Sequence, residues 1–502
     1  MDFTITKITR SRQIVRNIML LLISVILVAG CMPAQPVSPE PSIMVETPTI
    51  ATEEPATATP IATRPVYAAG TPVDYIVQTG DSLPAVAAHF NTTVKEILDV
   101  NPDLTKKETT LTPGSHITVP IYYEALWGNS YQIIPDSLFV NGPAQIGFDT
   151  ADFVDSQPGW LKNYTALAGD QTRRGGDVID YVALQYSVSP RLLLAIVEYQ
   201  AGALTQETLD PEKEDYPLGY VDPYHKGLYL QLVWAANALN NGYYGWRSGR
   251  LDTITRTNGT IEHPDPWQNA ATVGIQYYFS LVLPIEEYTQ AIYTEGLAKT
   301  YTELFGNPWV NVSDHIPGQL QQPAFILPFE TGKTWTYTGG PHAAWGNGEP
   351  LAALDFAPPT GTGGCVSTRE YTVAVADGQV VRSEPAIVML DLDKDGDERT
   401  GWVVLYLHIA TEERARPGVL VKAGDPLGHP SCEGGAATGT HIHIARKYNG
   451  EWVEAEGALG FNLDGWFAGN GIESYQGTLQ KFGRIVKAST IADPKSQITA
   501  GE

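Results

Sequence analysis

Hydrophobic and polar residues alternate with different periods along the chain, and the changes in period divide it into segments. Between residues 74 and 121, two stretches of helical spacing lie between two short alternating runs, which predicts the order strand, helix, helix, strand. From about 125 to 320, longer apolar stretches at helical spacing predict an all-α region. From about 322, short runs punctuated by Gly and Pro predict mainly antiparallel β structure. We therefore expect a multidomain protein.

The N-terminal segment combines a basic start with the apolar run IMLLLISVILVAG, within residues 1–30. This run is shorter than the roughly 20 residues that a membrane-spanning helix needs, so an export signal is favoured over a transmembrane helix. Its end, LVAGC, resembles the bacterial lipobox, which implies cleavage before Cys31 and lipid attached to that cysteine. We expect a lipid anchor at the outer face of the cytoplasmic membrane, with plain secretion or an uncleaved signal as the alternative. Residues 31–72, rich in Pro, Thr, Ala and Glu, are predicted to be a disordered linker.

Residues 73–122 carry the motifs YIVQTGDSL, NP and PGSHITVP around the two predicted helices. In this βααβ order they resemble the LysM domain over its whole length. The resemblance implies binding of glycans that contain N-acetylglucosamine, such as peptidoglycan. The glycan-binding residues that it implies lie in the first loop and after the second helix: Gly80, Asp81, Ser82, Leu83, Asn101 and Pro102.

The predicted helical domain, residues 125–320, contains the segment SPRLLLAIVEYQAG. Ser189 is its expected N-cap, Pro190 opens the helix and Gly202 closes it. The order of segments resembles lysozyme-like transglycosylase domains, in which a glutamate stands where this chain has Gln200. Glu198 is two residues away, which turns it by ~200° around the helix. Since an amide cannot protonate a glycosidic oxygen, we expect a degenerate and inactive lysozyme-like module.

The stretch TGTHIHIAR, residues 438–446, places two histidines two positions apart in a predicted strand. Alternate residues of a strand point to the same face, so His441 and His443 should lie side by side. Taken alone, the pair favours an exposed polar face over the alternative, a metal or catalytic site. The second interpretation needs partners elsewhere in the chain.

Two further segments, GGPHAAWGNGEPLAALDFAP and VVLYLHIA, supply those partners. With the HIH strand they resemble the lysostaphin-type zinc metallopeptidases, over a domain that we place at residues 322–487. The resemblance implies zinc ligation by His342, Asp355 and His443. Thirteen positions separate the first two of these residues, which departs from the usual HxxxD spacing but is similar to the staphylolysin-like branch. We expect the intervening loop to form a wall of the substrate site.

The same resemblance implies catalytic roles for His408 and His441. Three protein ligands leave a fourth zinc position open for water, whose pKa the metal lowers towards ~7. One of the two histidines can take the proton of that water, and either can stabilise the oxyanion or protonate the leaving amine. Imidazole suits these tasks because its ordinary pKa lies near ~6.5.

The charge and cysteine content narrow the compartment and the partners. There are 32 basic and 56 acidic residues, for a formal net charge of −24, which argues against nucleic acid as a partner. Of the three cysteines, Cys31 is expected to carry lipid. An exported protein with Cys365 and Cys432 remaining is expected to join them in a disulfide.

The segment DLDKDGDERTGW offers a second candidate metal site, a calcium loop. Its carboxylates are Asp391, Asp393, Asp395 and Asp397. Trp402 stands where a calcium-binding EF-hand needs a bidentate glutamate, so an acidic hairpin tip is the simpler interpretation. Residues 488–502 are expected to be a disordered tail.

These features favour a zinc endopeptidase that acts on peptide bonds of peptidoglycan and is targeted by LysM. The alternative is a catalytically silent peptidoglycan-binding or regulatory lipoprotein that recruits other wall hydrolases. A glycan-cleaving enzyme centred on the helical domain is disfavoured by Gln200. The scissile bond, Gly-Gly or D-Ala–diaminopimelate or another, is not encoded in any motif.

Overall fold

The computed structural model describes residues 65–122, 127–310, 312–491 and 493–502. The predicted export signal, the lipidation site at Cys31 and most of the Pro/Thr-rich linker lie outside these residues. Within the described part of the chain, no helix combines the length and apolarity that crossing a membrane requires.

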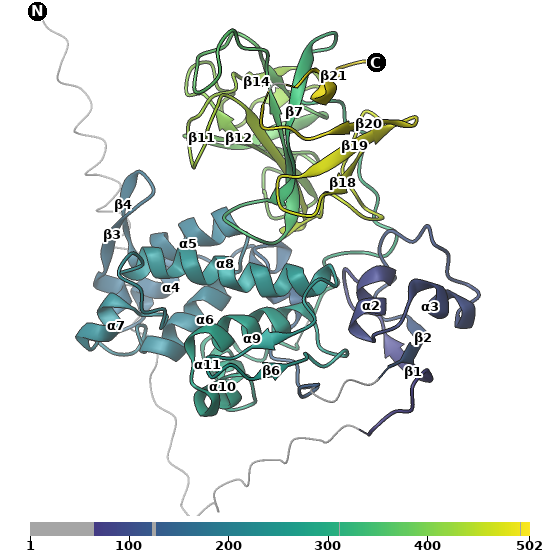
Figure 1. Ribbon diagram of the computed structural model, residues 1–502. Helices are drawn as coiled ribbons and strands as arrows, with labels where there is room; N and C mark the ends of the chain where they lie inside the picture. The colour runs from purple at the N-terminus through teal and green to yellow at the C-terminus, as the bar shows by residue number, and fades with distance from the viewer. Residues whose placement is uncertain (1–64, 123–126, 311, 492) are drawn as a thin grey trace, which may run out of the picture. The chain divides into compact units, whose positions relative to one another are not determined.

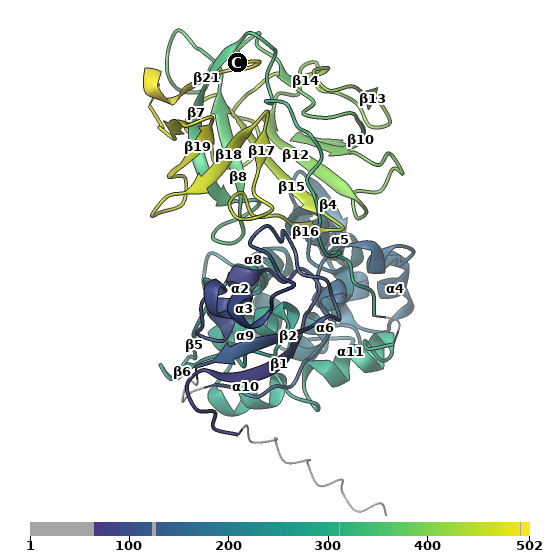
Figure 2. The same cartoon turned by 90° about the vertical axis from the view of Figure 1, so that its right-hand side faces the viewer.

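The first region has the predicted βααβ order: β1 (Thr71–Ile76), α2 (Leu83–His89), α3 (Val94–Val100) and β2 (His116–Ile121). The strands β1 and β2 pair antiparallel beside the two helices (Figure 2). Ser82 caps α2 by accepting from the backbone N–H of Ala85, and Thr93 forms a capping box with Glu96 at the start of α3. The apolar faces of these elements form one small core, against which Trp127 and Trp267 of the next region also pack.

The middle region is mainly helical, as predicted, with two short hairpins among the helices. Its helices are α4 (Thr150–Ser156), α5 (Gly175–Tyr186), α6 (Pro190–Ala201), α7 (Pro211–Asp215), α8 (Leu228–Arg247), α9 (Ala270–Val282), α10 (Ile285–Ala291) and α11 (Leu297–Phe305). The hairpins pair β3 (Thr165–Ala168) with β4 (Gln171–Arg174) and β5 (Ile254–Thr255) with β6 (Ile261–Glu262). The predicted limits of α6 are confirmed: Ser189 accepts from the N–H of Leu192, and Gly202 closes the helix in the left-handed conformation.

A nine-stranded antiparallel sheet forms the C-terminal region (Figure 1). The strands in spatial order are β13 (Leu420–Val421), β10 (Gly378–Glu384), β11 (Ala386–Asp391), β12 (Trp402–Ile409), β15 (Ile442–Tyr448), β8 (Leu351–Ala357), β7 (Thr334–Ala343) and β21 (Gln497–Thr499), with β16 (Glu451–Trp452) paired to β15. Smaller sheets pair β9 (Thr372–Val373) with β14 (Pro426–Gly428) and join β17 (Asn462–Leu463), β18 (Trp466–Asn470), β19 (Gly477–Lys481) and β20 (Arg484–Lys487). The strand that carries the HIH motif therefore lies in the middle of the large sheet.

The expected disordered tail is wrong for the residues that the structure describes beyond 488. A short 3-10 turn, Pro494–Ser496, leads into β21, which pairs with β7 at the edge of the large sheet. Ile498 is fully buried there. An apolar residue in a short polar segment finds its partner through tertiary contact, so the local composition gave no indication of the strand.

A buried ionic network at the end of α8 connects the three regions. Arg247 lies 2.9 Å from Glu451 of β16, 3.0 Å from Asp136 and 4.0 Å from Asp81 of the LysM-like region. His315, in the segment that leads into the C-terminal region, lies 2.6 Å from the same glutamate. Three buried carboxyl groups thus share one guanidinium, and burial raises the pKa of two of them, Asp81 and Asp136.

Candidate metal centre

Three central strands bring the predicted metal ligands together. In the β8–β15 register Asp355 is the direct partner of His443, and His342 lies on β7 opposite Ala353 of β8. All three side chains are buried. The thirteen-residue spacing between His342 and Asp355 is accommodated because the intervening chain leaves and re-enters the sheet between paired strands.

The facing atoms of this triad form a small triangle. His342 Nε2 lies 2.9 Å from His443 Nδ1, and Asp355 Oδ1 lies 3.3 Å from the first nitrogen and 3.4 Å from the second. Tetrahedral zinc with bonds of about 2.0 Å holds its ligand atoms about 3.3 Å apart. The triangle therefore has the dimensions of three ligands around one ion.

Backbone carbonyls fix which nitrogen of each histidine carries hydrogen. His342 Nδ1 donates to the Gly340 carbonyl at 2.8 Å, and His443 Nε2 donates to the Ala344 carbonyl at 3.0 Å. In the neutral rings, the two nitrogens that face each other are consequently both acceptors. Asp355 Oδ1, between them, is buried with no hydrogen-bond partner among the described residues. Three converging acceptors are the donor set that a bound cation needs, so these residues fit a metal ion.

The electrostatics of the triad agree with this interpretation. Burial would raise the pKa of Asp355, but His342 beside it holds that pKa well below its usual range. Burial would lower the pKa of His342, and the same carboxylate raises it instead. Burial lowers the pKa of His443. The Asp355 carboxylate is thus ionised and favours positive charge on His342. A metal ion at this position can supply that positive charge instead.

The two predicted catalytic histidines lie beside this triad. His408 is at the end of β12, next to Leu407, which pairs with His443 in the sheet. Its ring centroid is 4.4 Å from that of His441. His408 Nδ1 donates to the Glu433 carbonyl at 2.8 Å and His441 Nδ1 donates to the Gly439 carbonyl at 2.7 Å. Their Nε2 atoms are left as acceptors, and His441 Nε2 lies 3.9 Å from Asp355 Oδ2.

His408 occupies an unusual backbone conformation, with φ of +65°. A residue other than glycine is rarely found there, and such strained positions concentrate at functional sites. Burial, followed by the neighbouring His441, lowers the pKa of His408 to about 4. This ring is therefore neutral at physiological pH and available as a hydrogen-bond acceptor.

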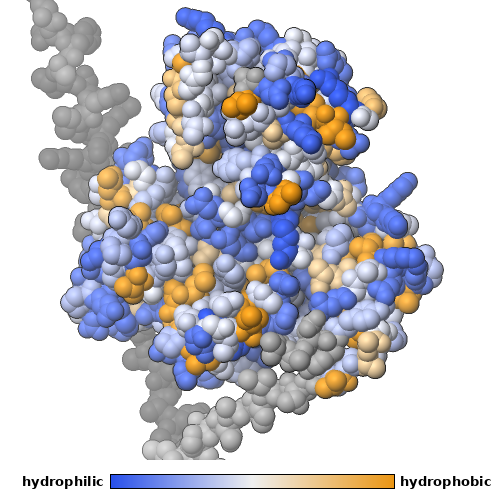
Figure 3. Space-filling view, in the orientation of Figure 1, coloured by the Kyte–Doolittle hydropathy of each residue, from blue (hydrophilic) through white to orange (hydrophobic). Residues whose placement is uncertain are grey.

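Tyr475 is a site residue that the sequence did not indicate. Its ring stacks on His342 with centroids 4.1 Å apart, and its carbonyl accepts from the N–H of Gly340 at 2.7 Å. Tyr475 is half-exposed, in the connection between β18 and β19, where Ile472 is also exposed. On the face that Figure 3 shows, hydrophobic residues form separate patches on a mainly hydrophilic surface. No local pattern distinguishes a tyrosine in a polar turn, so only the tertiary contact identifies it.

The predicted disulfide is confirmed: Cys365 and Cys432 are joined across a sequence separation of 67. The bond lies close to the site in the chain, because Glu433, whose carbonyl holds His408, follows Cys432 directly. On the other side of the bond, the N–H of Val366 donates to Thr440 Oγ1 at 2.9 Å, next to His441.

The residues predicted to bind glycan are only partly available in this structure. Asp81 accepts from Tyr75 and from the N–H of Gln78 and is buried, as is Leu83. Asn101 donates to the carbonyls of Ile97 and Thr118, so it holds α3 against β2. Gly80 and Ser82 line a cavity of about 370 Å³. Pro102 is not among the residues that line this cavity.

A segment of the chain crosses the same two LysM loops. Thr79 Oγ1 accepts from the N–H of Ile316 at 2.9 Å, and Thr110 Oγ1 donates to the Pro317 carbonyl at 2.7 Å and accepts from the N–H of Leu320 at 3.0 Å. We call residues 316–320 the strap. The strap therefore lies beside loop surface that the resemblance assigns to glycan, and Ile316 and Leu320 line the same cavity as Gly80 and Ser82.

The acidic hairpin between β11 and β12 is the weaker of the two predicted metal sites. Oxygen atoms of Asp391, Asp393 and Asp395 lie within 4.8 Å of one another. The fourth predicted ligand, Asp397, is instead paired with Arg399 at 2.6 Å. Asp391 accepts from the N–H of Gly396 at 3.0 Å. The hairpin's own backbone and arginine satisfy much of its charge, and calcium binding receives no support from these contacts.

Gln200 occupies the position at which the lysozyme-like resemblance has a catalytic glutamate. Gln200 lies 3.4 Å from the hydroxyl of Tyr278, and Glu198 accepts from the N–H of Leu204 at 2.7 Å and from Thr205. Glu198 thus closes the turn after α6. The prediction of an inactive module is consistent with this arrangement and remains a prediction.

Two family models match the chain. The LysM domain matches residues 75–120, and the N-terminal domain of LasA matches residues 132–319. The second match assigns the helical region to a LasA-type domain, and the lysozyme-like resemblance stays a prediction. The predicted metal ligands and catalytic histidines lie C-terminal to both matches.

The chain is also similar to individual known proteins. Protease LasA of Pseudomonas aeruginosa is 25% identical over 341 residues, which cover 64% of this chain and 75% of that protein. A deep-sea M23 metalloprotease, pseudoalterin, is 24% identical and the match covers 33% of this chain and 96% of that one, with a TM-score of 0.29. The catalytic domain of lysostaphin from Staphylococcus simulans is 21% identical over 24% of this chain and 89% of that one, with a TM-score of 0.18.

The family matches and the geometry of the site describe different parts of the chain. The LysM match covers the βααβ unit, and the match to LasA extends over most of that protein's length. The triad has the donor set and the spacing of a metal centre. The chain therefore carries a LysM domain and a LasA-type N-terminal domain, and it is similar to Protease LasA over three quarters of that protein.

Proposed function

We propose that the protein is a zinc endopeptidase that hydrolyses peptide bonds in the cross-links or stem peptides of peptidoglycan. The observation that carries the proposal is the facing pair of acceptor nitrogens, His342 Nε2 and His443 Nδ1, beside the buried Asp355 carboxylate. Two imidazoles and one carboxylate match catalytic zinc, which keeps a fourth position open. When bound, zinc supplies a Lewis acid that acidifies water and polarises a carbonyl group.

His441 is the residue to which we assign proton transfer. Its Nε2 is a free acceptor because Nδ1 donates to the Gly439 carbonyl. Asp355 Oδ2, 3.9 Å from that nitrogen, stabilises the imidazolium that forms when His441 takes a proton from the attacking water. The same nitrogen then returns the proton to the amine that leaves as the peptide bond breaks.

His408 has a complementary part in this scheme. Its pKa of about 4 keeps the ring neutral, and its Nδ1–H is held by the Glu433 carbonyl. His408 Nε2 is therefore an acceptor that orients an N–H or O–H group of the reactants. Its strained backbone fixes the direction of that acceptor before substrate arrives.

The substrate class is inferred from the domain combination. A LysM domain brings the enzyme to glycans that contain N-acetylglucosamine, and the relative named Protease LasA supports proteolysis. Export and a lipid anchor at Cys31 would place the enzyme at the outer face of the cytoplasmic membrane. The alternative, a silent wall-binding protein, is disfavoured because all three ligands and both catalytic histidines are present.

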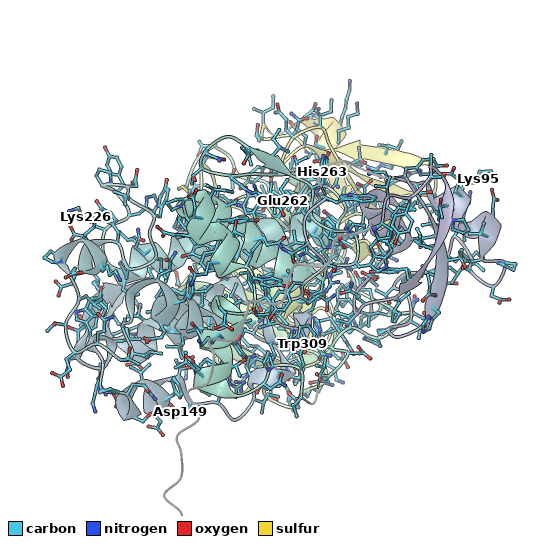
Figure 4. All side chains as sticks on the ribbon, turned by 90° about the horizontal axis from the view of Figure 1, so that it is seen from below. Lys95, Asp149, Lys226, Glu262, His263 and Trp309 are labelled. Atoms are coloured by element: carbon cyan, nitrogen blue, oxygen red, sulfur yellow. A yellow bond between two sulfur atoms is a disulfide. The ribbon has the colours of Figure 1, made fainter. Side chains whose placement is uncertain are left out.

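Mass spectrometry of digested peptidoglycan tests the proposal. Walls with defined cross-links are treated with the parent protein, with His441→Ala, and with the control His225→Ala. His225 pairs with Asp222 in the helical region, next to Lys226, which Figure 4 shows on the outside of that region. We expect new amino termini with the parent and the control, and at least ~100-fold slower release with His441→Ala. Release of sugar ends alone, or intact walls after parent treatment, would contradict the proposal.

A further inference from the structure

The loop between β7 and β8 contains the carbonyl that orients one metal ligand. Gly340 and Ala344 supply the carbonyls that hold His342 and His443. Gly340 belongs to β7 itself and is fixed by the sheet. Ala344, by contrast, is the first residue of a loop, residues 344–350, that leaves the sheet. The orientation of His443 therefore depends on what holds this loop.

Two asparagines of α8 hold it. Asn237 Oδ1 accepts from the N–H of Asn347 at 2.8 Å, and Asn241 Oδ1 accepts from the N–H of Glu349 at 2.8 Å. Their separation of four residues places both on one face of the helix. The N–H groups of two loop residues, Asn347 and Glu349, thus donate to two acceptors that are about one helical turn apart on α8.

The loop sequence is adapted to this contact. Gly346 and Gly348 have φ of +73° and +89°. A Cβ atom at Gly346 would lie 2.4 Å from Asn237 Oδ1, and one at Gly348 would lie 2.2 Å from Asn241 Oδ1. Both glycines are therefore required by the close approach of the loop to α8 as well as by the backbone conformation.

Further contacts close the loop around Ala344. The N–H of Ala344 donates to the Pro350 carbonyl at 3.1 Å, and the residue is fully buried. Arg250, just after α8, pairs with the Glu349 side chain, with Nε 2.8 Å from Oε1. Trp345 packs against the hydrophobic core of the helical region. The loop that we expected to be a substrate wall is thus attached to the helical region over its length.

We propose that Asn237 and Asn241 are positioning residues of the metal centre. By holding the loop, they fix the Ala344 carbonyl, which keeps hydrogen on His443 Nε2 and turns Nδ1 towards the other ligands. A partner that orients a metal-bound histidine typically contributes 10–100-fold to metal affinity. The helical region then has a function in the active site, although it supplies none of the three ligands.

This inference rests on the zinc site proposed above, and zinc affinity tests it directly. The purified whole protein is titrated with zinc in competition with a chromophoric chelator. The double variant Asn237→Leu/Asn241→Leu keeps the side-chain size and removes both acceptors. The double variant Asn237→Asp/Asn241→Asp keeps both acceptor oxygens. Asn258→Leu, in the exposed β5–β6 turn, where Asn258 accepts from Thr260, is the matched control.

We expect the double variant Asn237→Leu/Asn241→Leu to raise the zinc Kd about tenfold. The Kd of Asn237→Asp/Asn241→Asp should stay within about threefold of the parental Kd. The visible spectrum of bound Co²⁺ should change in Asn237→Leu/Asn241→Leu. It should stay as in the parent in Asn237→Asp/Asn241→Asp and in Asn258→Leu. Thermal unfolding of the metal-free proteins separates a loss of site geometry from a loss of fold. If the double variant Asn237→Leu/Asn241→Leu does not fold, the single variants are used instead. Asn237→Leu and Asn241→Leu are each expected to raise the zinc Kd about threefold.

A parental zinc Kd and Co²⁺ spectrum in the folded Asn237→Leu/Asn241→Leu protein would overturn the inference. An equal loss of zinc affinity in Asn237→Asp/Asn241→Asp would overturn it as well. In either case normal zinc binding by the parent would leave the proposed function intact. If the parent itself bound no zinc, the proposed function would fail first.

Discussion

The buried Glu451 carboxylate offers a sensitive test of the structure, because it links the C-terminal region to the end of α8. Its oxygens lie 2.9 Å from Arg247 Nε, 2.6 Å from His315 Nε2 and 2.8 Å from the Tyr243 hydroxyl. Glu451→Gln preserves the shape and removes the charge. Removing one partner of a buried ion pair typically costs 3–5 kcal/mol, and the retained hydrogen bonds favour a value near ~3 kcal/mol.

The pKa of Glu451 provides a second route to the magnitude. Burial would raise this pKa, but Arg247 and then His315 lower it to about 2. The ordinary value is ~4.3, and ~2 units of difference correspond to ~3 kcal/mol. Since the folded pKa is the lower one, this stabilisation is present above pH ~4.3 and is lost as the pH falls towards ~2.

Urea unfolding at several pH values measures the effect. We expect Glu451→Gln to be less stable than the parent by ~3 kcal/mol at pH ~7, with a difference that shrinks steadily below pH ~4.3. Glu456→Gln, at an exposed position five residues along, is the control and should match the parent. Equal stability of Glu451→Gln and parent at pH ~7, or a difference that is the same at pH ~3, would refute the reasoning.

Three further predictions concern the other features of the chain. Replacing Cys365 and Cys432 by Ser should lower the free energy of unfolding by up to ~4 kcal/mol, because their bond closes a long loop; unchanged urea unfolding would contradict this. Thr110→Val removes two hydrogen bonds to the strap, residues 316–320, and should strengthen binding of N-acetylglucosamine oligomers in calorimetry, whereas weaker binding would show that the strap supports the glycan site. Gln200→Ala should leave the digestion products unchanged, and loss of sugar-end release in that variant would instead assign glycosidase chemistry to the helical region.

Much of the metal centre could be predicted from the sequence because its residues lie in regular strands. The period-two spacing of His441 and His443 sets their common face, and the family motif supplies His342, Asp355 and His408. The structure places these five residues together, as expected. Short-range rules were also sufficient for α6, whose cap, first-turn proline and terminal glycine are all local signals.

The contacts that the sequence did not predict are all long-range. Tyr475 stacks on His342 from a turn with no distinctive pattern, and β21 forms only because the edge of β7 is available. Asp81 fits a binding loop by its position, yet the approach of Arg247 makes it part of a buried network. Composition and periodicity describe a segment's own preferences and contain no information about which distant surface it meets.

Zinc content measured together with peptide release tests the central claim most directly. The purified parent and His225→Ala should each bind about one zinc per chain and release peptides from peptidoglycan, and a chelator should abolish the release until zinc is restored. His443→Ala should hold much less than one zinc and release no peptides. A parent without zinc, or a His443→Ala protein that releases peptides at the parental rate, would contradict the account.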